Sequence, residues 1–239
     1  MITREQMNEV NQFLSGKNLP LDLKVEIFDH ILEQVDYKIE FEIKDFATAF
    51  LEIEKSWQRD LKMSRRFMWL PKTKIHHDTI WKSSIEIFKK SFSYFILYFI
   101  VSVTLMLYNK TLASNFLFAI YCLAIIVFFV YLIFNFKIIR TIAGNRDKKN
   151  ISYMQGGTQA FYLSSIFIIS MILINFDNRF DKYYNFIIGL KNNFDFTQVG
   201  IGAFIIFNIY AFGWVYGFCY YLQYKKSIEY LQQKMNLKL

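Results

Sequence analysis

Two kinds of hydrophobic pattern divide the chain near residue 90. Before that point, apolar residues recur every three or four positions among charged ones, the spacing of amphipathic helices. After it, four long stretches contain no charged residue: 91–109, 111–136, 150–176 and 196–224. Each is long enough for a helix to cross a hydrocarbon core of about 30 Å. The pattern predicts an all-α protein with a soluble helical head followed by a four-helix transmembrane bundle.

Local signals place three helices in the head. Thr3 and Gln6 fit a capping box at the start of the first helix, and Gly16 is suited to its end. Pro20 suits the first turn of the second helix, and Asp45 is a good N-cap for the third. The second helix is expected to have an apolar stripe and an opposite acidic side. The stripe is Phe28, Ile31, Leu32, Val35 and Ile39, and the acidic side is Asp22, Glu26, Asp29, Glu33 and Asp36.

The hydrophobic pattern and the charges together suggest four regions. They are an acidic helical domain (1–62), a basic amphipathic connector (63–90), a four-span domain (91–224) and a basic tail (225–239). Within the third region we expect spans at about 91–109, 112–136, 156–176 and 198–222. The loop between the last two spans is too apolar for a free loop, so we expect a short helix there, on the outer surface.

The net charge changes sign between the head and the rest of the chain. Residues 1–61 carry 7 Lys or Arg and 13 Asp or Glu, a net charge of −6. Residues 62–239 carry 21 and 7, a net charge of +14. The basic residues flank the uncharged stretches, which argues against a nucleic-acid partner and favours a membrane protein. Basic loops alternate with nearly neutral ones, so the positive-inside rule predicts that both termini are cytoplasmic.

A short segment of the second helix carries a family resemblance. Residues 19–30 contain Leu-Pro, an acidic residue and an Asp-His step in that order, and Phe50 and Trp57 follow. This part, roughly residues 8–62, resembles the helical domain of bacterial HAAS-type membrane proteins, whereas the membrane part is not matched. Members are often encoded beside PadR-type transcription regulators. The resemblance implies a cytoplasmic protein-interaction module on a protein anchored in the bacterial inner membrane. A PadR-type regulator is the candidate partner.

The acidic side of the second helix is the candidate partner-binding surface, formed by Glu26, Asp29, His30 and Glu33. Glu26, His30 and Glu33 share one helix face because they are four and three residues apart. Such a face is open to three interpretations: a solvated acidic surface, a protein-binding surface or a metal site. Zinc would require more nitrogen or sulfur ligands than this face offers. We therefore expect neither a metal nor a cofactor.

The connector is expected to meet the anionic inner leaflet of the bilayer. Basic and tryptophan side chains favour the water–lipid interface. The candidate interface residues are Arg65, Arg66, Trp69, Trp81, Lys82, Lys89 and Lys90. Alternatively, these basic residues only set the topology, which is compatible with interfacial binding. Asp78 is expected to N-cap the helix that enters the first span. The acidic head would then rest against this connector as an autoinhibitory contact.

Within the predicted spans, polar and small residues suggest helix packing. No charged residue falls inside them. Asn208 can hydrogen-bond to a neighbouring helix, and Gly213 and Gly217 allow close helix approach. We expect packing within one bundle, while the oligomeric state stays open. Cys122 and Cys219 lie in spans and are expected to be inert thiols.

These features favour an interaction protein over an enzyme. The sequence shows no paired carboxylates, nucleophile–base arrangement or metal cluster that would form a catalytic site. We therefore expect a membrane protein with a cytoplasmic interaction module and a regulatory or signalling role. The alternative is a small transporter or an accessory subunit of a membrane transport complex.

Overall fold

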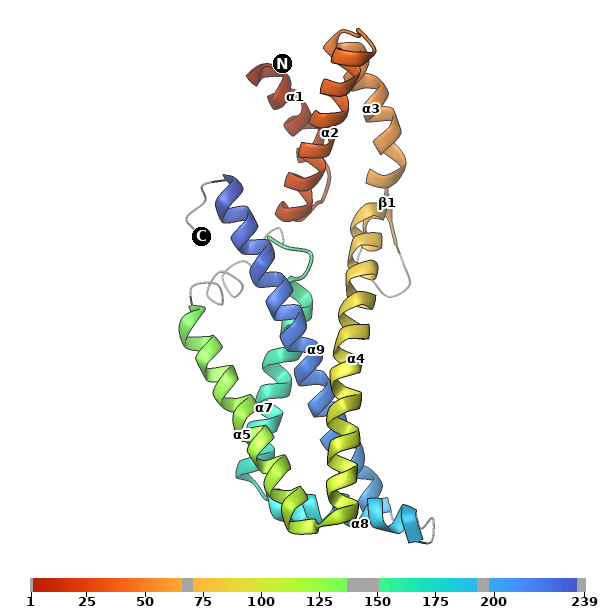
Figure 1. The fold of residues 1–239 in the computed structure, drawn as a ribbon. Helices are drawn as coiled ribbons and strands as arrows, with labels where there is room; N and C mark the ends of the chain where they lie inside the picture. Colours follow the sequence, from red (N-terminus) through yellow and green to blue (C-terminus); the bar gives the residue numbers. More distant parts are fainter. Residues whose placement is uncertain (1, 66–70, 137–150, 193–197, 236–239) are drawn as a thin grey trace. The chain divides into compact units, whose positions relative to one another are not determined.

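The computed structural model (Figure 1) describes the chain except residues 1, 66–70, 137–150, 193–197 and 236–239. Helices make up most of the described residues, which confirms the predicted all-α class. The chain divides into two compact units that are considered separately below. The first comprises residues 1–84, 141–155 and 226–239, and the second comprises 85–140 and 156–225. The first unit thus joins the predicted head with segments that come much later in the chain.

Three helices build the head: α1 (Arg4–Ser15), α2 (Leu21–Phe41) and α3 (Phe46–Leu61). The α2 helix contacts both α1 and α3. Their apolar stripes meet in one core that includes Val10, Leu14, Ile27, Ile31, Val35, Ala49, Phe50 and Ile53, all buried. Phe28, Leu32 and Ile39 are partly buried against it. The predicted apolar stripe of the second helix therefore does face the core.

The expected N-caps of α1 and α3 form as predicted. The Thr3 backbone N–H donates to Gln6 Oε1 at 2.8 Å, and the Gln6 backbone N–H donates to Thr3 Oγ1 at 3.3 Å, which completes the capping box. Asp45 Oδ2 accepts from the Thr48 backbone N–H at 3.2 Å. Pro20 lies one position earlier than predicted, as the extended N-cap residue of α2. Its fixed φ is compatible with either position.

A short hairpin and the helix after it differ from expectation. Strands β1 (Met63–Ser64) and β2 (Lys72–Thr73) pair antiparallel, and α4 (Lys74–Tyr108) follows β2 directly. The prediction that Asp78 caps this helix is wrong, because Asp78 lies inside α4. Thr73 Oγ1 instead accepts from the His76 backbone N–H at 3.4 Å. The sequence from Lys74 to Tyr108 contains no proline or glycine, so the helix continues without interruption into the first span.

The remaining elements confirm the prediction of four spans. They are α5 (Lys110–Phe134), the 3₁₀ turn η1 (Gln155–Thr158), α7 (Gln159–Leu173), α8 (Phe176–Asn192) and α9 (Gln198–Met235). Four helices are long and apolar enough to cross a membrane: α4, α5, α7 with its preceding 3₁₀ turn, and α9. The α8 helix occupies the loop in which a short helix was expected. The α9 helix continues through Met235, beyond the predicted end of the fourth span.

Candidate functional site

The candidate partner-binding face lies on the middle of α2. Glu26, His30 and Glu33 are exposed, and His30 Nδ1 lies 3.6 Å from Glu33 Oε2. The backbone therefore presents these three side chains to solvent on one face, as their spacing predicted. Pairs as exposed as this contribute little to stability. The face is available for binding, and its own internal contacts do not hold it in one arrangement.

Asp29, the fourth residue predicted for this surface, already has a partner in the chain. Its carboxylate forms an ion pair with the ammonium group of Lys234, near the C-terminal end of α9. The two side chains are partly exposed, at 33% for Asp29 and 44% for Lys234. This side of α2 thus already binds a basic residue, which comes from another helix of the same compact unit.

Asp22 was predicted to lie on the solvated acidic side, and this prediction is wrong: its exposed fraction is only 5%. Its Oδ2 accepts from Ser227 Oγ at 2.7 Å, and its Oδ1 accepts from the Tyr153 backbone N–H at 3.4 Å. Its own backbone N–H donates to Ile151 O at 3.1 Å. One carboxylate therefore connects the start of α2 with residues 151–153 and with α9.

Burial raises the pKa of the Asp22 carboxyl above its ordinary value of 3.8. Hydrogen bonds from Ser152, Ser227, Leu23 and Tyr153 act in the opposite direction, because they stabilise the charged form. The donors compensate only part of the cost of removing a carboxylate from water. The charged form of Asp22 is consequently unfavourable in this position, although several segments of the chain donate hydrogen bonds to it.

The two contacts between α2 and α9 share one register. Ser227 and Lys234 are seven residues apart on α9, as are Asp22 and Asp29 on α2. Seven residues are close to two helical turns, so both pairs lie on one face of each helix. Leu231 lies between them on the same face of α9 and is fully buried. The end of α9 is thus attached to the acidic helix at two polar points on either side of an apolar residue.

Within the described part of the chain, no three His, Cys, Asp or Glu side chains are grouped as a metal site would require. The other two histidines, His76 and His77, are buried near the start of α4. The role of Glu26, His30 and Glu33 in binding a partner stays a prediction.

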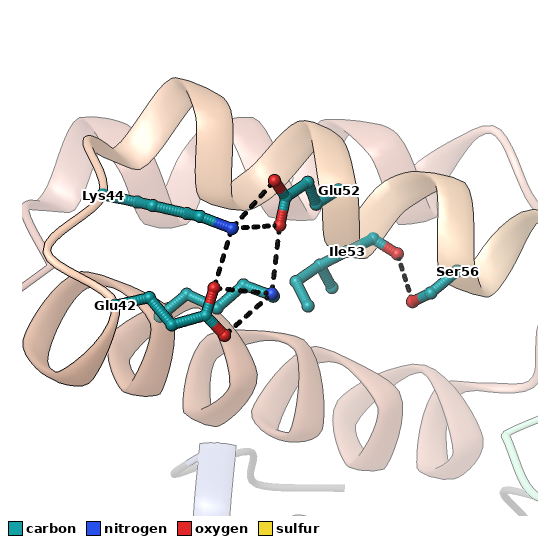
Figure 2. Close-up of polar contacts among 6 residues, drawn as sticks. Glu42, Lys44, Glu52, Ile53 and Ser56 are labelled. Atoms are coloured by element: carbon teal, nitrogen blue, oxygen red, sulfur yellow. Dashed lines mark hydrogen bonds and ion pairs between the residues drawn. The ribbon is translucent and has the colours of Figure 1, made fainter.

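A cluster of ion pairs, which the sequence analysis missed, joins the end of α2 to α3 (Figure 2). Lys44 Nζ lies 2.7 Å from both Glu42 Oε2 and Glu52 Oε2, and Lys38 Nζ lies 3.0 Å from Glu52 Oε2. The hydrogen bonds that Lys44 donates to Glu42 and Glu52 raise the pKa of Lys44 to about 12. The alternation of Lys and Glu was visible in the sequence, but Glu52 comes from a different helix. Only the packing of α3 against α2 brings the four charges together.

The membrane-interface candidates that can be placed are exposed. Arg65 follows β1, while Arg66 and Trp69 lie outside the described residues. On α4, Trp81 is 59% exposed, and Lys82, Lys89 and Lys90 are also exposed. The connector reaches the head through an ion pair between Lys74 Nζ and Asp60 Oδ1 at 3.0 Å. Lys74 on α4 and Lys234 on α9 thus each form an ion pair with an acidic residue of the head.

The helix-packing candidates all make contacts inside the second unit. Asn208 Nδ2 donates to Phe204 O at 2.8 Å and to the Tyr183 hydroxyl, on α8, at 3.3 Å. A Cβ placed on Gly217 would lie 2.2 Å from the Phe161 backbone nitrogen, and one on Gly213 would lie 2.7 Å from Ser164 Oγ. The two glycines therefore let α9 approach α7 of the same chain.

Comparisons of the chain with protein-family models, with curated proteins and with solved structures found no match.

Proposed function

We propose that this protein is a membrane-anchored interaction protein with a regulatory or signalling role. Its head binds a cytoplasmic protein partner through the acidic face of α2. The observation that carries the proposal is the ion pair between Asp29 and Lys234. It supports the proposal because this side of α2 already pairs with a basic residue of another helix, while Glu26 and Glu33 beside it stay exposed.

The chemistry of the face favours a basic partner surface. Glu26 and Glu33 add two carboxylates to a head with a net charge of −6 over residues 1–61. Charge complementarity of this kind accelerates association and selects among partners more than it adds affinity. A regulatory contact that forms and dissociates suits such a surface. The resemblance of residues 8–62 to the HAAS-type helical domain points to a PadR-type regulator as the first partner to test.

Site-specific photocrosslinking in cells tests this proposal with the full-length chain. A photoreactive residue at position 26 or 33 should capture a protein partner, whereas one at the exposed Gln12 on α1 should capture much less. Capture should fall in the double variant Glu26→Lys/Glu33→Lys. It should persist in Glu5→Lys/Glu9→Lys, which changes the net charge equally at exposed positions of α1. Equal capture from all positions and variants would reject the acidic face as the binding surface.

The alternative function, a small transporter or an accessory subunit of one, would place the activity in the membrane bundle. A cavity of about 230 Å³ lies among its spans, with a lining that contains no charged residue. A cavity of this kind suits an apolar solute better than an ion or a sugar. Solute uptake that depends on the chain, and that is unchanged by Glu26→Lys/Glu33→Lys, would favour this alternative.

A further inference from the structure

The second unit contains a cavity of about 230 Å³ that all four membrane-spanning helices line. Tyr98 comes from α4, Tyr121 and Ala124 from α5, Ile168 from α7, and Trp214 from α9. Tyr121 and Ile168 are 1% exposed, and Ala124 is 8% exposed. The inner wall is therefore buried, and it is formed by side chains far apart in the sequence.

The polar groups of the lining tyrosines are already occupied. The hydroxyls of Tyr98 and Tyr121 lie 3.0 Å apart, and the Tyr121 hydroxyl donates to Phe207 O at 3.3 Å. Because the Tyr121 hydroxyl donates its proton to Phe207 O, the Tyr98 hydroxyl must be the donor to Tyr121. Both hydroxyl protons are therefore used in hydrogen bonds. The remaining side-chain donor of the lining is the indole N–H of Trp214, which is buried and makes no hydrogen bond among the described residues. A polar molecule entering the cavity could therefore gain this one hydrogen bond, which does not replace its lost hydration. The chemistry of the wall selects a hydrocarbon.

The cavity is continuous with the surface that faces lipid. Leu123, which lines it, is 58% exposed on α5, and the same helix exposes Ile126 and Val130. Since α5 is one of the membrane-spanning helices, these exposed apolar side chains lie against lipid chains. A hydrocarbon chain can thus reach the cavity from the bilayer without crossing water.

We propose that this cavity binds a hydrocarbon chain of a membrane lipid, whose headgroup stays outside. An apolar cavity of about 150 Å³ already holds a benzene molecule in a soluble protein. The larger volume here accommodates part of an acyl chain but not a whole lipid. The bound chain fills space among the four spans and contacts Trp214. This inference is independent of the function proposed for the head.

Quenching of Trp214 by brominated lipid chains tests the proposal. In the full-length chain, Trp57→Phe, Trp69→Phe and Trp81→Phe leave Trp214 as the sole tryptophan. The protein in detergent is titrated with a phospholipid brominated in mid-chain. We expect fluorescence loss that saturates at a single lipid per chain. A fluorescence loss that rises in proportion to the lipid concentration without saturation would overturn the proposal.

Cavity-filling variants locate the site. In the same background, Ala124→Leu should abolish the saturable loss, because its side chain projects into the space the lipid chain would occupy. Ala119→Leu adds the same atoms on the same helix at an exposed position outside the lining and should leave the loss unchanged. Ala211→Leu fills the cavity from α9 and replaces Ala124→Leu if that variant fails to fold. Saturable quenching that survives filling would contradict this location.

Discussion

Ser227 donates a hydrogen bond of 2.7 Å to the buried carboxylate of Asp22, although 205 positions separate the two residues. The same carboxylate accepts from the backbone of Tyr153. The start of α2, residues 151–153 and the end of α9 therefore share one acceptor within the first compact unit. The helix that carries the acidic face is thus hydrogen-bonded to two segments that are distant in the sequence.

Removing this acceptor should loosen the attached segments. In Asp22→Ala, the partly buried Ser227 hydroxyl and Tyr153 N–H lose this acceptor, at a cost of about 1 kcal/mol each, the lower end of the range for unsatisfied groups. Hydrogen exchange of the full-length chain should show lower protection in residues 220–235 and at 151–153. Glu26→Ala, on the exposed side of the same helix, should leave both segments unchanged. Unaltered protection in Asp22→Ala would mean that the hydrogen bonds are not what holds α9 in place.

The pH dependence of that attachment follows from burial. Because burial raises the pKa of Asp22 above 3.8, the folded state favours the protonated carboxyl. Its contribution to stability is complete below pH 3.8 and is lost as the pH rises through the raised pKa. Intrinsic-rate-corrected hydrogen exchange between pH 3.5 and 7 should show this trend at residues 226–235. The variant Asp22→Asn cannot ionise at this position, so it should lack this loss of protection with rising pH. The Asp29–Lys234 pair is present in both proteins, so the difference between them isolates Asp22.

The cluster of Lys38, Glu42, Lys44 and Glu52 should stabilise the head in a salt-dependent way. Replacing Glu52 by Gln removes one carboxylate from both lysines, so the melting temperature of the head should fall slightly at low ionic strength. The loss should disappear at about 1 M salt, where the Debye length is roughly 3 Å. Glu54→Gln, which lies outside the cluster, is the matched control. A loss that is independent of salt would point to packing and not to charge.

Ile43, in the turn between α2 and α3, has a φ of 54° and is 90% exposed. A β-branched residue in this left-handed region is strained, by about 1–2 kcal/mol relative to a residue that tolerates it. Ile43→Asn should therefore raise the thermal stability of the head, since no burial is lost. Ile43→Val keeps the branch and should give no gain. A decrease in stability with Asn would show that the Ile43 side chain makes contacts that outweigh the strain.

The close approach of α9 to α7 should tolerate no added atom at Gly217. A Cβ there would meet the backbone of Ala160 and Phe161, which cannot rotate away. Gly217→Ala should destabilise the bundle by about 1–3 kcal/mol, in the range of overpacked cores. Gly202→Ala, on the same helix with open space around its Cβ position, should be neutral or slightly stabilising, because Ala is the better helix former. Thermal melting of the two variants in detergent distinguishes these outcomes.

Local signals were sufficient wherever the partners are neighbours in the sequence. The capping box of Thr3 and Gln6 and the N-cap of Asp45 involve residues only three apart, and both were predicted. The start of α4 was misplaced because Asp78 and Thr73 are both good caps. Which of them is used depends on the pairing of β1 with β2, and that pairing does not follow from local propensity. Asp22 was misplaced because its partners are 131 and 205 positions away.

The sequence by itself determined the helical class, the number of spans and the acidic character of the head. These follow from periodicity, from the length of uncharged stretches and from local charge, which need no knowledge of contacts. The tertiary structure alone decided which acids are buried or paired, which helix accepts Gly217, and where a cavity remains among the spans. Those outcomes depend on how distant side chains fill shared space, and packing of that kind is a property of the folded chain.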